Sequence, residues 1–405
     1  MKRIQLKLHW QILISLVLAF CFGFFLTDYV YLVGWIGELF LKGLKMVIIP
    51  LILSSIISGV TSLGSGNKLG RLGLKTMFYY LSTSFLAIMT GLLLVNLIAP
   101  GKGMELPVTG QQDMALHALS FKEVILNIVP DNIVASMAEG NMLPIIFFAI
   151  LSGFFITQLN EEPKKTLGDF FNALFELMMK ITLFIIRFTP FGVFGLVAKE
   201  VARNIDSLSL LAGNMGIYML TVVGALIIHS AFSLPMIMRL VGKVNPVKHA
   251  KNMITPLMTA FSTASSSATL PLTIDAVENK SGVSNKISSF TLPLGATVNM
   301  DGTALYECVA AIFIANAYGI ELSFAQQALV VLTALVTSIG AAGIPMAGLV
   351  MISVILSAVG LPLEGIGVIL AVDLPLDMLR TTTNVWSDSC GAVVIAKSEG
   401  EELQV

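Results

Sequence analysis

Six polar residues near the C-terminus recur at steps of three and four: Asp373, Asp377, Arg380, Thr381, Asn384 and Asp388. On a helix that turns about 100° per residue, they share an arc of about 100°. A charge at the centre of a membrane helix costs about 2.5 to 3.5 kcal/mol, so this face must meet a partner or water. Because a guanidinium binds a carboxylate bidentately and a carboxylate suits an ammonium group, Arg380 beside Asp377 predicts a binding site for an acidic amino acid. The plain alternative is an internal Arg380–Asp377 pair, which leaves Asn384 and Asp388 unexplained.

A second polar cluster is Asn299-Met300-Asp301-Gly302-Thr303, within one long apolar stretch. It combines an amide, a carboxylate, a flexible glycine and a hydroxyl. Hard cations such as sodium prefer oxygen ligands, and an unwound membrane helix also exposes backbone carbonyls. The cluster therefore predicts a cation site. The alternative is a helix kink whose backbone groups are satisfied by the Asn and Asp side chains.

Three consecutive serines, Ser265-Ser266-Ser267, form the third candidate. Serine in a membrane helix often bonds to its own backbone, which is the simpler interpretation. At the tip of a helical hairpin, short side chains instead leave backbone N–H groups at a helix N-terminus free to meet a carboxylate.

The composition shows where these residues must be positioned. Hydrophobic residues make up 56% of the 405-residue chain, charged residues only 12%, and the mean hydropathy is +0.86. Such a chain belongs in lipid. The 24 basic and 25 acidic residues exclude the basic surface of a nucleic-acid-binding protein. Cys21, Cys308 and Cys390 are widely spaced and predict neither a disulfide framework nor a metal site.

Apolar windows long enough to cross a bilayer, about 20 residues each, lie near 10–27, 33–62, 75–99, 130–159, 168–200 and 209–240. The first is interpreted as a membrane helix because no cleavage site closes it. Residues 249–278 and 325–361 each divide into two apolar halves, typical of re-entrant hairpins. The breaks are Ser265–Ser267 and a glycine-rich segment from Gly340 to Pro345.

Each hairpin precedes a long apolar stretch with polar residues in its middle, 287–318 and 364–397, and both are expected to be interrupted helices. This repetition predicts an inverted repeat in an all-α polytopic membrane protein, with the binding site where the broken elements meet. Basic clusters at the ends of the spans place both termini in the cytoplasm.

The segments Ser265–Pro271, Asn299–Thr303 and Asp377–Asp388 closely resemble the glutamate transporter family, the dicarboxylate/amino acid:cation symporters. The resemblance extends over nearly the whole chain in order. It implies eight transmembrane helices plus two re-entrant hairpins, a homotrimer in the inner membrane and an elevator mechanism. A scaffold of 8–62 and 120–203 would hold the trimer, and a transport domain of 75–99 and 206–397 would move.

The resemblance also implies a substrate site for L-glutamate, L-aspartate or a related dicarboxylate. Arg380 with Thr303 would hold the side-chain carboxylate, and Asp377 would hold the amino group. Asn384 and Ser266 would hold the main-chain carboxylate, while Thr381 lines the pocket. The segment from Ile344 to Gly348 would close as the outer gate. Ala264 and Ser265, at the first hairpin, would also line the substrate site. Ala264 stands where archaeal members of the family carry an arginine.

Sodium ions are the coupling ions that the resemblance implies, with no other cofactor. One sodium site would use Asp388 with backbone carbonyls at Gly295, Asn299 and Asn384. A second site would use Asp301, Asn299, Tyr80, Thr83 and Ser84. A third site would use backbone oxygens around Thr297, Ser338, Ile339 and Ala341. Glu307 would carry a proton, with possible counter-transport of potassium. Trp386 and Ser387 depart from the family, in which a glycine commonly precedes the acid at 388.

Three alternatives remain open. A proton-driven carrier of succinate, fumarate or malate would also use Arg380, but it would have to bury Asp377 without an ammonium partner. An intramembrane protease would need a histidine near the serines or a catalytic aspartate pair. A channel could use polar hairpins as a water-filled path, but a channel neither saturates like a carrier nor concentrates its substrate.

Overall fold

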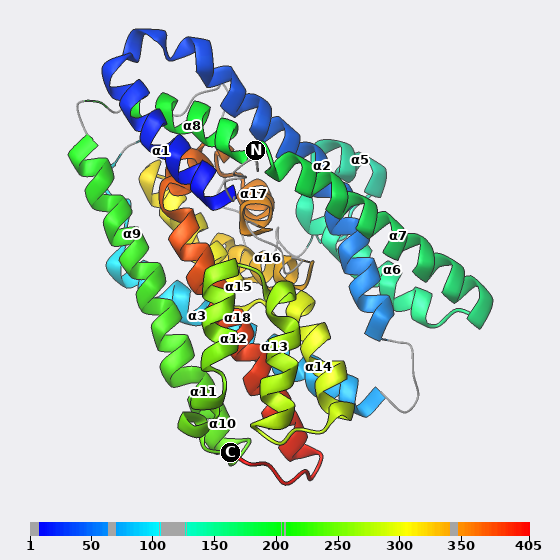
Figure 1. Ribbon diagram of the computed structural model, residues 1–405. Helices are drawn as coiled ribbons and strands as arrows, with labels where there is room; N and C mark the ends of the chain where they lie inside the picture. Colours follow the sequence, from blue (N-terminus) through cyan, green and yellow to red (C-terminus); the bar gives the residue numbers. More distant parts are fainter. Residues whose placement is uncertain are drawn as a thin grey trace, which may run out of the picture.

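The computed structural model describes residues 8–63, 70–104, 106, 126, 128–203, 205, 208–340 and 347–405. Every regular element within these ranges is helical (Figure 1). The first half contains α1 (Leu8–Phe25), η1 (Thr27–Tyr29), α2 (Tyr31–Leu63), α3 (Gly70–Ile98), α5 (Ile133–Glu139), α6 (Met142–Thr157), α7 (Glu161–Ile186) and α8 (Thr189–Arg203). The second half contains α9 (Leu208–Ile228), η3 (His229–Ser233), α10 (Leu234–Leu240), α11 (Pro246–Asn252), α12 (Ile254–Thr263), α13 (Ser266–Asn279), α14 (Asn285–Val298), α15 (Asp301–Ala317), α16 (Phe324–Gly340), α17 (Ala347–Val359), η4 (Leu363–Gly365) and α18 (Ile366–Ser398).

Several of these helices are long and apolar enough to cross a membrane. Within the described ranges, four segments qualify: 31–61 in α2, 71–98 in α3, 209–240 through α9 and α10, and 285–317 through α14 and α15. The pair α7 and α8, bent by 54° where they meet, adds a fifth. The prediction of an all-helical membrane protein with several apolar helices is therefore confirmed.

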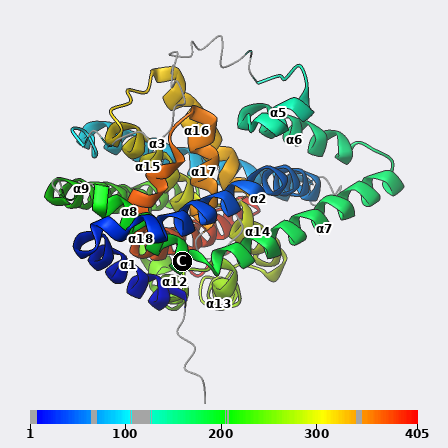
Figure 2. The ribbon, with the colours of Figure 1, turned by 90° about the horizontal axis from the view of Figure 1, so that it is seen from above.

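Two sets of helices pack chiefly among themselves. In the first, α2 lies against α6, α7 and α8, and α8 also packs on α1. In the second, α15 lies against α3, α16 and α18, and α18 contacts α12, α13 and α14. Figure 2 shows α5, α6 and α7 extending to one side of the molecule. Nearly every side chain of α15 is buried, so polar groups on α15 must find partners within the protein.

The first predicted hairpin is present, but its break is shorter than expected. α12 ends at Thr263, and its C-cap residue Ala264 has a φ of +48°, in the left-handed region. Ser265 is the N-cap of α13, and its hydroxyl accepts a hydrogen bond from the Ala268 N–H at 3.3 Å. Ser266 and Ser267 therefore belong to helix α13, because one left-handed residue and one capping residue suffice to reverse the chain. Around the second break, α16 and α17 pack together, and residues 341–346 lie outside the described residues.

The two long stretches after the hairpins differ from each other. The first is interrupted as predicted, because Asn299 and Met300 leave helical geometry between α14 and α15. The second prediction was wrong, since α18 is continuous from Ile366 to Ser398, including Trp386 and Ser387. The polar residues of α18 share one face and find partners on neighbouring helices, so its backbone does not need to open.

The C-terminal residues fold back onto the helix ends. Glu399 accepts hydrogen bonds from Lys75 at 2.5 Å and from Arg71 at 2.6 Å. These bonds hold the pKa of the Glu399 carboxyl below its ordinary value. Glu401 bonds both the backbone N–H and the hydroxyl of Ser284 at the start of α14. The tail thus links the ends of α3, α14 and α18.

Candidate functional site

The guanidinium of Arg380 is the centre of the polar face of α18. It is 1% exposed, its Nη2 donates to Asp377 Oδ1 at 2.7 Å, and the same nitrogen forms an ion pair with Asp373 Oδ1 at 3.2 Å. Its Cζ lies 3.8 Å from the ring centroid of Tyr306, a cation–π contact. Nε and Nη1 have no hydrogen-bond partner among the described residues. One edge of the guanidinium is therefore held by acids, while the remaining donors suit a carboxylate.

The second hairpin touches this guanidinium through a glycine. A Cβ added at Gly348, in the first turn of α17, would lie 2.7 Å from Arg380 Nη1. Any side chain at this position would displace the guanidinium. The structure thus brings together two residues predicted from distant parts of the sequence, whereas Ile344 lies outside the described residues.

Asn384 joins α18 to the start of α15. Its Oδ1 accepts a hydrogen bond from the Gly302 N–H at 2.8 Å, and its Nδ2 donates to Thr303 Oγ1 at 3.1 Å. Thr381 is also buried on this part of α18. The Asn384 bonds place Thr303 against the polar face of α18.

The first hairpin packs against the same helix. Ser266 is buried in the first turn of α13, and Ala264 and Ser265 form the turn before it. Both α12 and α13 pack against α18. The predicted serines therefore lie at the tip of a hairpin that contacts the helix carrying Arg380.

The carboxylate of Asp301 is surrounded by oxygen-bearing side chains. Its Oδ1 accepts from Ser84 Oγ at 2.6 Å and from Thr83 Oγ1 at 3.3 Å. The Oδ1 of Asn299 lies 3.4 Å from the same Thr83 hydroxyl. Tyr80 is buried beside this group, but its hydroxyl donates to the Thr291 carbonyl at 2.7 Å. Four of the five predicted ligands of this site converge, and Tyr80 OH is bonded elsewhere.

Asp388 marks a second oxygen cluster, one turn along α18 from Asn384. Its Oδ1 accepts from Asn299 Nδ2 at 2.9 Å. A Cβ added at Gly295 would lie 2.5 Å from this Oδ1. The structure therefore places Asp388, Asn299 and Gly295 together. In the described part of the chain, no group of three or more His, Cys, Asp or Glu side chains is arranged to hold a metal ion. Sodium does not require one, because hydroxyls, amides and carbonyls can bind it.

The substitution Gly295→Ala tests the space beside Asp388. The new methyl group would lie 2.5 Å from Asp388 Oδ1 and 2.7 Å from Tyr80 OH, so the carboxylate must move. We expect the half-saturating sodium concentration for thermal stabilisation to rise at least about tenfold, or about 1.4 kcal/mol of binding free energy. Gly73→Ala is the matched control, since its Cβ would meet Phe290 at an ordinary 3.7 Å. Equal sodium dependence in both variants would contradict the assignment.

The third predicted sodium site is the least complete. Thr297 is exposed, and its hydroxyl bonds within α14 to the Leu294 carbonyl at 3.0 Å. Ser338 is buried and bonds to the Leu335 carbonyl at 2.8 Å. Ile339 belongs to the last turn of α16, and Ala341 lies outside the described residues. This grouping stays a prediction.

Glu307 is fully buried on α15, one turn after Thr303. Its Oε2 accepts from Thr337 Oγ1 on α16 at 3.0 Å, and its Oε1 has no hydrogen-bond partner among the described residues. An ionised carboxylate with an unpaired buried oxygen is costly, so this environment favours a group that can bind a proton. The alternative, a glutamate bonded permanently to a neighbouring helix, stays open beside it, because Thr337 belongs to α16.

Four side chains at these clusters were given no role in the sequence analysis. Tyr306 and Asp373 hold Arg380, and Tyr306 OH also donates to Asp373 Oδ1 at 2.7 Å. His229 and Ser387 contact Asp301. His229 carried a usable signal, since an ionisable side chain within an apolar span marks a functional position by default. Asp373 belonged to the recognised polar face but was given no role.

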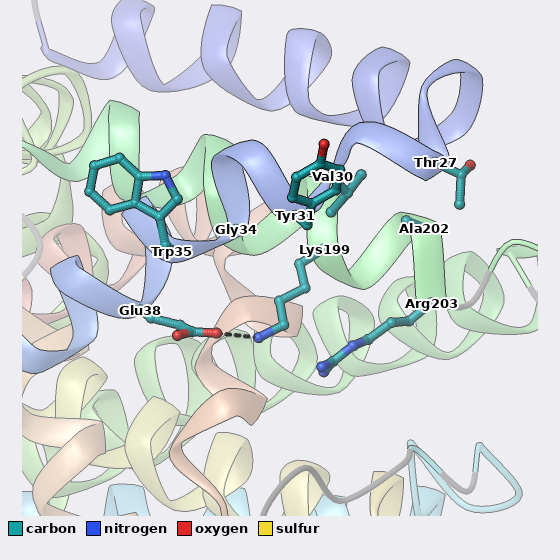
Figure 3. Close-up of a pocket in the computed structure, with 9 residues that line it drawn as sticks. All are labelled: Thr27, Val30, Tyr31, Gly34, Trp35, Glu38, Lys199, Ala202 and Arg203. Atoms are coloured by element: carbon teal, nitrogen blue, oxygen red, sulfur yellow. Dashed lines mark hydrogen bonds and ion pairs between the residues drawn. The ribbon is translucent and has the colours of Figure 1, made fainter.

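A separate cavity of about 560 Å³ lies between the start of α2 and the end of α8 (Figure 3). Lys199 Nζ bonds Glu38 Oε1 in it at 2.6 Å, and Tyr31 and Trp35 form part of its wall. None of the predicted site residues lines this cavity. It is therefore distinct from the clusters on α15 and α18.

Comparison with known proteins identifies the family of the chain. The pattern of the sodium:dicarboxylate symporter family matches residues 8–398. Over 98% of its length, the chain is 36% identical to excitatory amino acid transporter 3 of Mus musculus, covering 87% of that protein. Over 98% of its length, the chain is also 37% identical to the proton/glutamate-aspartate symporter of Escherichia coli and covers 94% of that protein. Its identity to the proton/sodium-glutamate symport protein of Bacillus caldotenax is likewise 37% over 98% of the chain, which covers 96% of that protein. The chain belongs to the sodium:dicarboxylate symporter family.

Proposed function

We propose that this protein is a sodium-coupled symporter that imports L-glutamate or L-aspartate. The observation that carries the proposal is the buried Arg380, which is held by Asp377 and Asp373 and keeps unpaired N–H donors beside Gly348 of the second hairpin. The names of the similar proteins, glutamate and aspartate symporters among them, support the same substrates.

In this proposal each residue of the substrate site has a role. Arg380 with Thr303 binds the side-chain carboxylate, because the guanidinium offers two adjacent donors. Asp377 binds the ammonium group. Asn384, Thr381 and the hairpin tip at Ala264–Ser266 bind the main-chain carboxylate through amide, hydroxyl and backbone N–H donors. Gly348 allows the second hairpin to close against the guanidinium.

Sodium occupies the two oxygen clusters in this proposal. Asp301, Asn299, Thr83 and Ser84 form one, with Tyr80 beside them, and Asp388, Asn299 and Gly295 form the other. Asn299 contacts both, since its Oδ1 lies near the Thr83 hydroxyl and its Nδ2 donates to Asp388, which offers a physical route for coupling. The third site at Thr297, Ser338, Ile339 and Ala341 is carried over as a prediction.

We further propose eight transmembrane helices, two re-entrant hairpins, a homotrimer and an elevator movement in the inner membrane, with both termini cytoplasmic. The scaffold would be residues 8–62 and 120–203, and the transport domain 75–99 and 206–397. The packing of α1, α2, α6, α7 and α8 among themselves, and of α3, α12–α15 and α18 likewise, supports two bodies that move relative to each other.

Proton co-transport through Glu307, and with it potassium counter-transport, forms part of this proposal. With Glu307→Gln, we expect uptake to lose its acceleration by an inward proton gradient, because the amide cannot bind and release a proton. Uptake would be measured in proteoliposomes with fixed sodium and internal pH while external pH varies. Glu321→Gln is the control, at an acid outside the helices. Unchanged pH dependence in Glu307→Gln would remove the proton-carrier role.

The test of the whole function is uptake of labelled L-glutamate by proteoliposomes under an inward sodium gradient. We expect saturable accumulation above equilibrium, which a channel cannot produce. The same vesicles with labelled succinate, and a proton gradient in place of sodium, test the C4-dicarboxylate alternative. Concentrative succinate uptake without glutamate uptake would overturn the amino acid assignment.

A further inference from the structure

A buried histidine lies against the Asp301 cluster. His229 is fully buried, and its Nε2 lies 3.0 Å from Asp301 Oδ2. An ionised carboxylate only accepts hydrogen bonds, so Nε2 carries the proton and donates it. Nδ1 has no hydrogen-bond partner in the described part of the chain. The contact with Asp301 is therefore the one hydrogen bond of this imidazole within the described residues.

The two oxygens of Asp301 have different partners. Oδ2 accepts from His229 and from Ser387 Oγ, the latter at 2.6 Å. Oδ1 faces the hydroxyls of Ser84 and Thr83. A carboxylate held at one oxygen by two donors presents its other oxygen in a defined direction. His229 thus aims Oδ1 at the hydroxyl cluster.

The backbone that carries His229 is itself fixed to α18. His229 begins η3, a π-helical turn between α9 and α10, and such turns are frequent at functional sites. Trp386 Nε1 donates to the Ser230 carbonyl at 3.0 Å, and the Ser230 and Thr383 hydroxyls lie 3.2 Å apart. These two contacts fix the turn against α18, the helix that also carries Ser387.

Ser387 extends the arrangement to the second oxygen cluster. Its hydroxyl, which donates to Asp301, accepts from Asn299 Nδ2 at 3.0 Å. The same amide nitrogen donates to Asp388 Oδ1. A chain of hydrogen bonds therefore runs from His229 through Asp301, Ser387 and Asn299 to Asp388.

We propose that His229 is a positioning residue for the cation site at Asp301, and that its hydrogen bond sets the affinity of that site for sodium. This inference rests on the proposed sodium coupling. The imidazole does not bind the ion; it orients the carboxylate that does. Groups behind a metal ligand commonly change metal affinity by about 10- to 100-fold when they are removed.

The test is sodium-dependent thermal stabilisation of the full-length protein in detergent, with sodium chloride exchanged for choline chloride at constant ionic strength. His229→Leu and His229→Asn remove the contact, since leucine has no donor and the asparagine amide is too short to reach. We expect each to raise the half-saturating sodium concentration about 10- to 100-fold. His229→Gln places an amide N–H near the position of Nε2 and should restore most of the affinity.

His249 supplies the matched control. It is equally buried, bonds Ser281 Oγ at 2.9 Å and Ser389 Oγ at 3.1 Å, and stacks on Trp386. None of these three residues is a predicted cation ligand. His249→Gln should lower the melting temperature in choline and leave the half-saturating sodium concentration unchanged. A histidine with only a packing role would give this same result at position 229.

The outcomes separate the inference from the proposed function. Unchanged sodium affinity in folded His229→Asn, or a loss in His229→Gln as large as in His229→Leu, would overturn the positioning role while sodium coupling stands. If the unmodified protein shows no stabilisation by sodium over choline, sodium coupling itself fails, and the role of His229 fails with it. If His229→Leu does not fold, the two amide variants still decide the question.

Discussion

Arg380→Gln is expected to abolish saturable uptake of L-glutamate and L-aspartate, with at least about a 100-fold loss of affinity, or about 2.8 kcal/mol. The guanidinium is 1% exposed and is the cation at the centre of the polar face. Glutamine cannot offer paired charged donors to a carboxylate, and a charge-assisted hydrogen bond is roughly twice as strong as a neutral one. Equilibrium binding of labelled substrate, in addition to uptake, would measure the loss.

Loss of substrate binding in Arg380→Gln must be separated from destabilisation by the acids that Arg380 neutralises. Removing Arg380 leaves Asp373 and Asp377 without their cation, which is destabilising by about 3 to 5 kcal/mol for a buried pair. The double variant Arg380→Gln with Asp373→Asn restores the net charge of the three-residue cluster. It should melt at a higher temperature than the single variant and still fail to bind substrate. Recovery of glutamate binding in the double variant would show that Arg380 only balances charge.

Asp388→Asn is expected to raise the half-saturating sodium concentration for uptake at least about tenfold, with a smaller effect on maximal uptake at saturating sodium. Asp388 is the only charged side chain of its cluster, and its Oδ1 lies 2.9 Å from Asn299 Nδ2. An amide keeps the size but removes the charge that attracts the ion, and tenfold in affinity is only about 1.4 kcal/mol. Uptake initial rates over a sodium series would measure it.

Asp275→Asn is the matched control for Asp388→Asn. Asp275 lies on α13 in an exposed bond to Asn279 Nδ2 at 2.8 Å and belongs to neither oxygen cluster. Its variant should keep the unmodified sodium dependence. If Asp388→Asn also keeps that dependence, Asp388 does not bind a coupling ion, and proton-driven dicarboxylate transport becomes the better account of the protein.

Much of the fold was predictable because it depends on local pattern. Apolar length identified α2, α3 and the α9–α10 segment, and steps of three and four showed that Asp377, Arg380 and Asn384 share a face. Hydropathy did not show the 54° bend between α7 and α8, because a bend depends on a few backbone angles and not on composition. The sequence pattern also failed to show that α18 is continuous. Polar residues within a membrane helix can mark an interruption of the helix, but they can equally form hydrogen bonds with neighbouring helices and leave it intact.

The sequence by itself determined that the chain is a helical membrane protein and which residue types form its polar faces. Only the tertiary structure decided which of those groups meet. Asp301 and His229 are 72 positions apart in sequence, and Arg71 and Glu399 are 328 apart. Periodicity reports one helix at a time, whereas a site formed by α3, η3, α15 and α18 depends on how their faces pack. That packing placed His229 and Ser387 on Asp301 and Gly348 on Arg380.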